Sequence, residues 1–255
     1  MEGAVLRPWD VLGLIFYGLS LQEILTVIPS VCKSWGKAVA EHGLKDIDII
    51  EWGKSRTTDH VDRMLQMLIT RSSNSLRKLS VSGISDDLIF SFIANHASNL
   101  ETLWLPIGKM SSSIVEQVAW KLSTVINLDL SYCVNIKAPA LEAIGKHCKS
   151  LKELHRLTYP PHNMKNEKCE NEIHAIVTTM PKLKHLELSY MVLSSECANQ
   201  ILSGCPELQC FDVRRCFKVT LEVDIVNGKK FPGLTIFVPP PIDHMRRRRR
   251  SLLLW

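Results

Sequence analysis

The sequence predicts an α/β protein, in which a short helical N-terminal domain is followed by a curved solenoid of strand-plus-helix repeats. Two observations predict this architecture. Apolar residues near the N-terminus recur at the three- and four-residue spacing of buried helical faces, and a leucine pattern with a period of about 25 residues occupies most of the remaining chain. Because one strand–helix unit cannot bury its own apolar face, the units are expected to stack around a continuous core.

The N-terminal domain is predicted from three short helical runs between residues 8 and 39. Pro8 and Asp10 suit the first turn of the first run, where an anion meets the positive end of the helix dipole. The second run is expected to end at Pro29, whose ring cannot continue a helix, and the third contains Trp35. Three short helices cannot cover all their apolar faces by themselves, so a partner is expected to cover the rest.

The same residues resemble an F-box, the motif that docks on the Skp-type adaptor of a Skp–cullin–F-box ubiquitin ligase. The resemblance covers residues 6–47, with one departure at Arg7, where the family usually has leucine. It implies that the adaptor-binding residues are Pro8, Asp10, Val11, Leu12, Ile15, Phe16, Leu19, Val31, Cys32 and Trp35. The alternative is a small helical cap on the repeats that meets no adaptor.

The repeats follow the pattern Leu-x-x-Leu-x-Leu over residues 44–238, which predicts seven to eight units. Copies begin at Leu44, Leu76, Leu100, Val125, Leu151, Leu183, Leu208 and Leu234. The first copy, Leu44-x-x-Ile47-x-Ile49, is interpreted as a degenerate opening repeat and the last, Leu234-x-x-Phe237, as a degenerate closing one. The copy at Leu151 has Arg156 at its third apolar place. Alternation within a copy predicts a strand. Helix-period residues between copies are Leu88, Phe92, Ile93, Ile114, Val118, Leu122, Leu141, Ile144, Cys148, Ile173, Ile176, Met180, Ile201 and Cys205.

Four of the eight cysteines recur at two places of the repeat. Cys133 and Cys216 follow the last apolar strand residue by three positions, whereas Cys148 and Cys205 precede the next copy by three. Inward-facing periodic thiols behave as small buried hydrophobes. No secretory signal is recognised, so an intracellular protein of the nucleus, the cytoplasm or both is expected. The placement resembles the cysteine-containing repeats of plant F-box/leucine-rich-repeat proteins, and this resemblance extends to about residue 235.

Each copy also has one position, between its last two apolar residues, that is expected to face solvent on the concave side. The residues at this position are Ser80, Trp104, Asp129, His155, Glu187 and Asp212. An exposed tryptophan in a row with acids suits a protein-binding anchor, so the row from Trp104 onward is the candidate substrate surface. The alternative is that variable strand positions merely tolerate polar residues. The polar, proline-broken segment 158–171 is a second candidate recognition element.

The net charge of +5 does not predict nucleic-acid binding. Arg246 to Arg250 supply five positive charges, and without them the chain has 26 basic and 26 acidic residues. The run lies in a Pro/Arg-rich tail, residues 239–255, which is expected to be disordered; the alternative is a nuclear-import signal. No apolar run approaches the roughly 20 residues that span a bilayer, so no membrane partner is expected.

The sequence contains no recognised catalytic or metal-binding pattern, and neither a cofactor nor a metal is expected. Cys148 follows His147, but adjacent helical residues point about 100° apart, which argues against a nucleophile–base pair. An enzyme that uses Cys32 or Cys148 is therefore the weakest hypothesis. The F-box resemblance implies a non-catalytic subunit that binds the adaptor, and through it the cullin and RING subunits, and presents a protein target for ubiquitination and proteasomal degradation. The alternative is a leucine-rich-repeat scaffold that acts without a cullin ligase.

Overall fold

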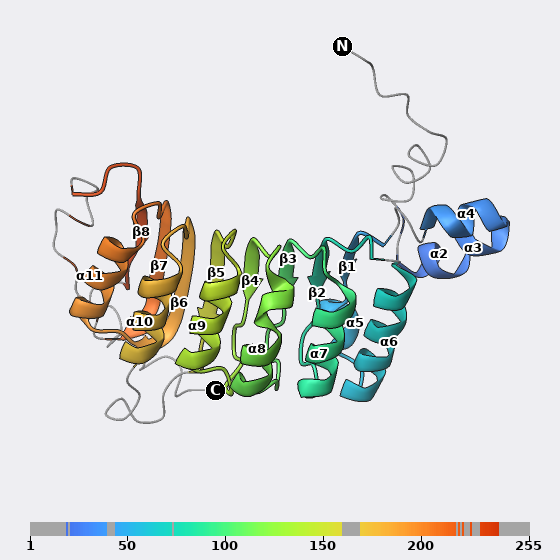
Figure 1. The fold of residues 1–255 in the computed structure, drawn as a ribbon, viewed down its shortest axis with the longest axis horizontal. Coiled ribbons are helices and arrows are strands. Elements are labelled where there is room, and N and C mark those ends of the chain that lie inside the picture. Colours follow the sequence, from blue (N-terminus) through green and yellow to red (C-terminus); the bar gives the residue numbers. More distant parts are fainter. Residues whose placement is uncertain are drawn as a thin grey trace, which may run out of the picture.

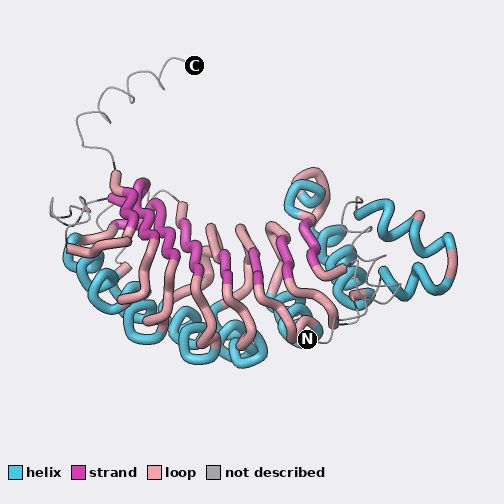
Figure 2. Tube along the Cα trace, turned by 90° about the horizontal axis from the view of Figure 1, so that it is seen from above, coloured by secondary structure: helices cyan, strands magenta, loops and turns pink. Residues whose placement is uncertain are grey.

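The computed structural model describes residues 19, 21–39, 44–72, 74–159, 169–217, 219, 221, 225 and 230–239. Within this part, an eight-stranded parallel sheet has its strands in chain order from β1 to β8 (Figure 1). The strands line the concave side of a curved array, and the helices α6 to α11 line the convex side (Figure 2). The predicted α/β repeat architecture is confirmed.

The strands are short, as the repeat pattern predicts. They are β1 Asp46–Asp48, β2 Lys78–Ser80, β3 Thr102–Trp104, β4 Asn127–Asp129, β5 Glu153–Leu157, β6 His185–Val192, β7 Cys210–Phe217 and β8 Thr235–Phe237. The second apolar residue of each copy forms one line across the sheet: Ile47, Leu79, Leu103, Leu128, Leu154, Leu186, Phe211 and Ile236. All of these except Ile236 are buried, and each such side chain stabilises the fold by roughly 1.5–3 kcal/mol.

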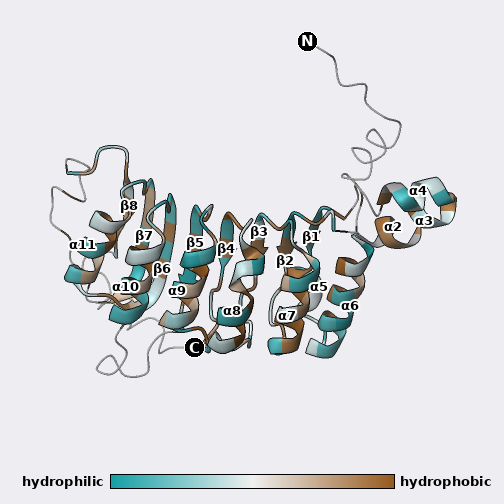
Figure 3. Cartoon of the chain, in the orientation of Figure 1, coloured by the Kyte–Doolittle hydropathy of each residue, from teal (hydrophilic) through white to brown (hydrophobic). Residues whose placement is uncertain are grey.

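The helices of the array are α5 Ile50–Gly53, α6 Thr58–Arg71, α7 Asp87–His96, α8 Ser112–Val118, α9 Ala138–His147, α10 Glu170–Thr179 and α11 Ser195–Gly204, with a 3₁₀ turn, η2, at Ala119–Leu122. Their buried sides face the sheet, and hydrophilic residues gather on their outer sides (Figure 3). Short α5 differs from the rest because it lies on the concave side of the sheet, next to β1 (Figure 2).

Two predicted positions in the array are wrong. Ile236 rather than Phe237 pairs with Phe211, so Phe237 aligns with Asp212 on the concave row. Leu88 is 80% exposed instead of buried. The Asp86 carboxylate accepts hydrogen bonds from the backbone N–H groups of Leu88 and Ile89, which places Leu88 in the first turn of α7, on its outer side. The other helix-period residues are buried or half-buried.

The N-terminal segment is described from residue 21 to 39, together with Leu19, and contains α2 Leu21–Thr26, α3 Ile28–Val31 and α4 Lys33–Ala38. The second predicted run is therefore two helices. Pro29 lies in the first turn of α3, where a missing N–H costs nothing, so it begins a helix instead of ending one. The first predicted run lies outside the described residues, apart from Leu19.

The periodic thiols join consecutive repeats. The Cys133 Sγ donates to the Leu105 carbonyl at 3.1 Å, and the Cys216 Sγ donates to the equivalent Leu188 carbonyl at 3.3 Å. Cys148 and Cys205 donate in the same way to Leu122 and Met180. All four residues are buried, and all eight cysteines are free thiols. None of the described helices is long and apolar enough to cross a membrane.

Candidate functional site

The concave row predicted from the repeat pattern exists as a continuous line of residues in register. Ser80 pairs with Trp104, and Asp129, His155, Glu187 and Asp212 follow on successive strands. The register extends the row to Asp48 on β1 and Phe237 on β8. Because neighbouring strands lie about 4.8 Å apart, these side chains form one surface across the sheet.

Solvent exposure along the row is lower than predicted. Asp129, His155 and Glu187 are half-buried, but Ser80 and Asp212 are buried. Ser80 lies near the β1 end of the sheet, where α5 occupies the concave side (Figure 2). The Asp212 carboxylate is covered by Arg214, whose guanidinium donates to both carboxylate oxygens at 2.5–3.1 Å. A residue at a solvent-facing strand position is therefore not always accessible.

Trp104 is likewise only half-buried, not freely exposed. The Lys78 ammonium lies 4.7 Å from its ring centroid, a distance suited to a cation–π contact. Its indole Nε1 is buried and has no hydrogen-bond partner among the residues that the structure describes, and the same holds for the Ser80 Oγ on the neighbouring strand. Part of the ring is thus packed into the face, and the remaining part is available to a ligand.

His155 is held between two carboxylates. Its Nδ1 lies 2.8 Å from Glu187 Oε2, and its Nε2 lies 2.6 Å from Glu153 Oε1. The hydrogen bond to Glu187 raises the pKa of His155 to about 9; burial opposes this rise, and the bond to Glu153 adds to it. The imidazolium therefore donates from both nitrogens at neutral pH. Glu153 was not among the predicted residues, although its position two residues before His155 on one strand places both side chains on the same face.

Arg156, at the third apolar place of its copy, is only 2% exposed. Its Nε and one terminal nitrogen donate to the two carboxylate oxygens of Glu172 on α10, at 3.2 and 3.3 Å. The remaining N–H groups donate to the backbone carbonyls of Leu130, Cys133 and Ile136, at 2.9–3.4 Å. Because all five donors have acceptors, a charged residue can occupy this buried position.

Arg156 also replaces a thiol of the repeat. The Leu130 carbonyl is equivalent to the Leu105 and Leu188 carbonyls, which accept from Cys133 and Cys216. The copy that begins at Leu151 has Tyr159 where those copies have cysteine, and the Arg156 guanidinium supplies the donor to the Leu130 carbonyl instead. The pairing of Arg156 with Glu172 also fixes the start of α10 after the predicted insertion.

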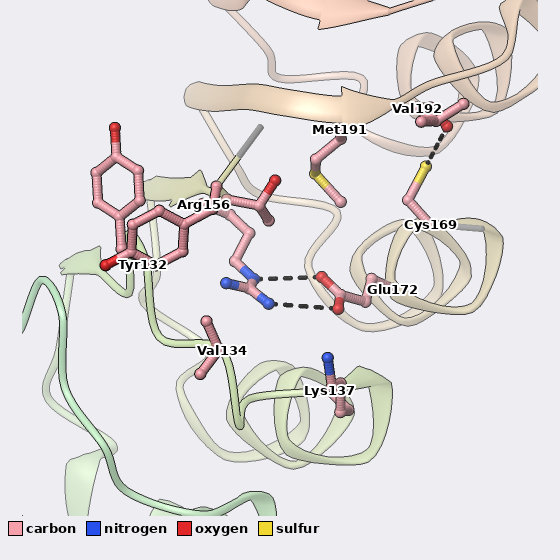
Figure 4. Close-up of a pocket in the computed structure, with 10 residues that line it drawn as sticks. Tyr132, Val134, Lys137, Arg156, Cys169, Glu172, Met191 and Val192 are labelled. Atoms are coloured by element: carbon pink, nitrogen blue, oxygen red, sulfur yellow. Dashed lines mark hydrogen bonds and ion pairs between the residues drawn. The ribbon is translucent and has the colours of Figure 1, made fainter. Parts of the chain in front are cut away.

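A pocket of about 400 Å³ opens beside the Arg156–Glu172 pair, beyond the C-terminal ends of β4 and β5 (Figure 4). It is lined by Tyr132, Val134, Lys137, Arg156, Thr158, Tyr159, Cys169, Glu172, Met191 and Val192. Tyr132 has a φ of 61°, which is unusual for a side chain of this size. The predicted recognition segment 158–171 contributes its two ends to the pocket, and residues 160–168 lie outside the described residues.

The predicted adaptor-binding residues are described only in part. Val31 is 54% exposed and Cys32 is exposed, whereas Leu19 and Trp35 are partly buried against the core. Val27, which precedes α3, is 53% exposed. Pro8, Asp10, Val11, Leu12, Ile15 and Phe16 lie outside the described residues, as do the tail from residue 240 and its arginine run.

The thiol chemistry of Cys148 is that of a core residue. Burial raises its pKa to about 12, and its thiol donates to the Leu122 carbonyl at 3.1 Å. A nucleophilic cysteine needs the opposite shift, toward the thiolate. Across the described ranges, no group of three or more His, Cys, Asp or Glu residues is placed to hold a metal ion.

Comparison with known proteins gives three informative similarities, although no protein-family model matches the chain. F-box protein FBW2 of Arabidopsis thaliana is 46% identical over 245 residues, which cover 93% of this chain and 77% of that protein. Putative F-box/LRR-repeat protein 22 of the same plant is 29% identical over 221 residues, 86% of this chain and 71% of that protein. F-box protein SKIP19, also from Arabidopsis thaliana, is 28% identical over an alignment of the same length and coverage.

Proposed function

The chain belongs to the F-box proteins, and we propose that it is the substrate-recruiting subunit of a Skp–cullin–F-box ubiquitin ligase. In this proposal, residues 6–47 bind the Skp-type adaptor, which brings the cullin and RING subunits. The leucine-rich repeats bind a protein target, which is then ubiquitinated and degraded by the proteasome. The 46% identity to an F-box protein over 93% of the chain is the observation that supports this role most strongly.

The described N-terminal helices support an adaptor contact at α3. Ile24, Ile28 and Val39 are buried, and they hold this segment together. Val27, which precedes α3, and Val31, at its end, are both more than half exposed. Exposed apolar residues that gather in one place mark a protein-binding surface.

In this proposal, the chain promotes ubiquitin transfer by holding the target close to the ubiquitin-loaded enzyme. A target bound to the repeats and an adaptor bound to the F-box belong to one assembly, so the target lysines meet the ubiquitin-loaded enzyme at a raised effective concentration. No catalytic group of this chain is needed for that effect. A repeat scaffold that acts without a cullin ligase would bind the same target and leave the adaptor unbound.

The target surface is proposed to be the concave row, with Trp104 as an apolar anchor and Asp129, His155, Glu187 and Asp212 beside it. His155 carries a positive charge that partly offsets its two carboxylate partners, and Arg214 offsets Asp212. The acidic character therefore concentrates at Asp129 and the Glu153–Glu187 pair. A target segment with basic side chains complements this surface.

Affinity purification from plant extract with the full chain tests the assignment of this surface. Trp104→Ala is expected to weaken binding of the co-purified target by about 2 kcal/mol or more, the loss typical of an interface anchor. Trp120→Ala is the matched control, because Trp120 is 57% exposed on the convex side, and it should bind normally. Deletion of residues 242–255 should also leave target binding unchanged. Normal binding by Trp104→Ala together with loss on tail deletion would place recognition elsewhere.

A further inference from the structure

We infer that the pocket between Tyr132, Lys137 and Met191 is a second contact for the recruited protein, and that it takes an acidic side chain with a large apolar neighbour from an extended segment. This inference rests on the proposed function and adds a specificity site to it. The pocket lies outside the row of residues predicted from the repeat pattern, and nothing in the periodicity indicates it.

The walls of the pocket have the composition of an interface centre. Tyr132 and Tyr159 lie with ring centroids 5.0 Å apart, and Val134 and Tyr159 are about half exposed. Met191, a polarisable and adaptable side chain, lies on the opposite side of the cavity (Figure 4). Tyrosine and methionine are enriched at protein interfaces, and a volume near 400 Å³ accommodates one or two side chains.

Among the described residues that line the pocket, Lys137 is the cation without a described partner for its side chain. Arg156 uses all its donors on Glu172 and on backbone carbonyls, and its pairing neutralises the Glu172 carboxylate. The Cys169 thiol donates to the Val192 carbonyl, and the Thr158 hydroxyl donates to the Ser189 carbonyl. No hydrogen bond or ion pair joins the Lys137 ammonium to a described residue, and its side chain points toward the Arg156–Glu172 pair (Figure 4). An acidic group of a bound ligand would therefore pair with the Lys137 ammonium.

The pocket is continuous with the concave row. Arg156 follows His155 on β5, and Tyr132 follows Asp129 by three residues at the end of β4. One bound segment can therefore contact both surfaces.

This continuity sets the sequence pattern of the ligand. Three strand residues span about 10 Å, and an extended peptide covers about the same distance with three residues. A segment that places a basic residue against Asp129 or Glu187 therefore reaches the pocket about three to five residues away. The ligand class is a peptide segment in which a basic residue and an acidic residue are separated by that spacing, with an aromatic or large aliphatic residue next to the acid.

A phage-displayed library of random linear peptides, selected on the full chain, tests this inference. Enriched peptides should contain the acidic–apolar pair and a basic residue at the stated spacing. Lys137→Glu should weaken those peptides by about tenfold or more and, in a new selection, enrich peptides with a basic residue in place of the acid. Lys137 makes no side-chain cap with α9, and a carboxylate at a helix start is favourable, so the variant should fold normally.

Lys152→Glu is the matched control. Lys152 is an exposed lysine at the N-terminal end of β5, whereas the pocket lies beyond the C-terminal end of that strand. It changes the net charge equally and should keep the original peptides. The inference is overturned if no peptide is enriched, if Lys137→Glu binds the original peptides normally, or if Lys152→Glu loses them to the same degree. Adaptor capture by the same preparation separates this failure from failure of the proposed function, because the peptide pocket does not contribute to the F-box.

Discussion

Arg156 shows how a single residue can depart from a repeat without breaking it. At this place the other copies from Leu44 to Leu208 have leucine, isoleucine or valine, which need only an apolar environment. Arginine is tolerated because Glu172 and three carbonyls surround the guanidinium with acceptors. The cost of removing its charge from water is then offset locally.

Removal of one member of this pair should be strongly destabilising. Arg156→Leu leaves the Glu172 carboxylate without its partner in a mostly buried site, and a loss of about 3 kcal/mol or more in the free energy of unfolding is expected. Arg156→Leu combined with Glu172→Leu should recover most of this loss, because leucine fits the same place in the neighbouring repeats. Urea denaturation followed by circular dichroism measures both. Equal stability of Arg156→Leu and the unchanged chain would contradict the role of the pair.

His155 makes the free energy of unfolding depend on pH. The pKa of His155 is about 9 in the folded chain and about 6.5 in an unfolded chain. The hydrogen bonds of the imidazolium to Glu187 and Glu153 therefore stabilise the folded chain fully below pH 6.5, and this stabilisation is lost as the pH rises through 9. The unchanged chain should therefore exceed His155→Gln in free energy of unfolding by more at pH 6.5 than at pH 10. Denaturant titrations at the two pH values measure this. A difference that does not depend on pH would show that His155 is not held as the imidazolium.

At the scale of elements, the cysteine thiols act as small core groups with a donor, and each joins its repeat to the preceding one. Burial raises the pKa to about 11 for Cys133 and Cys205 and to about 12 for Cys148 and Cys216. Both the burial and the protonated state protect them from electrophiles.

Alkylation of the native chain should consequently separate two classes of cysteine. Cys32 is exposed and should react with iodoacetamide, whereas Cys133, Cys148, Cys205 and Cys216 should react only after unfolding. Peptide mass spectrometry after a timed labelling reaction distinguishes the two classes. Rapid native labelling of the four thiols, or a native disulfide between any two of them, would contradict this assignment.

The elements that follow the repeat period could be predicted from the sequence, and those that depend on local geometry could not. The strand register was predictable because each buried leucine occupies the same place in its copy. The shift at β8 was not, since Leu234, Ile236 and Phe237 are all apolar and fit either register. The Arg156–Glu172 pair and the pocket depend on a helix placed after an insertion, for which periodicity gives no rule.

At the scale of the whole molecule, a rigid array presents one row of side chains on its concave face, and an N-terminal helical segment exposes apolar residues beside it. The concave row could be predicted as a set, but its exposure could not, because α5 and Arg214 cover parts of it. In the proposed role, the adaptor and the target bind separate surfaces, so each contact can be altered without changing the other.

Capture of a purified Skp-type adaptor by the full chain tests the central claim most directly. Val31→Asp places a charge on the exposed surface of α3, and Leu12→Asp introduces one into the first helical run that the sequence predicts; each should weaken adaptor binding by about tenfold or more. Leu88→Asp is the matched control, because Leu88 is the most exposed large apolar residue described on the convex helices, and it should bind the adaptor normally. Equal adaptor capture by Val31→Asp, Leu12→Asp and Leu88→Asp would contradict the assignment of residues 6–47 as an adaptor-binding F-box.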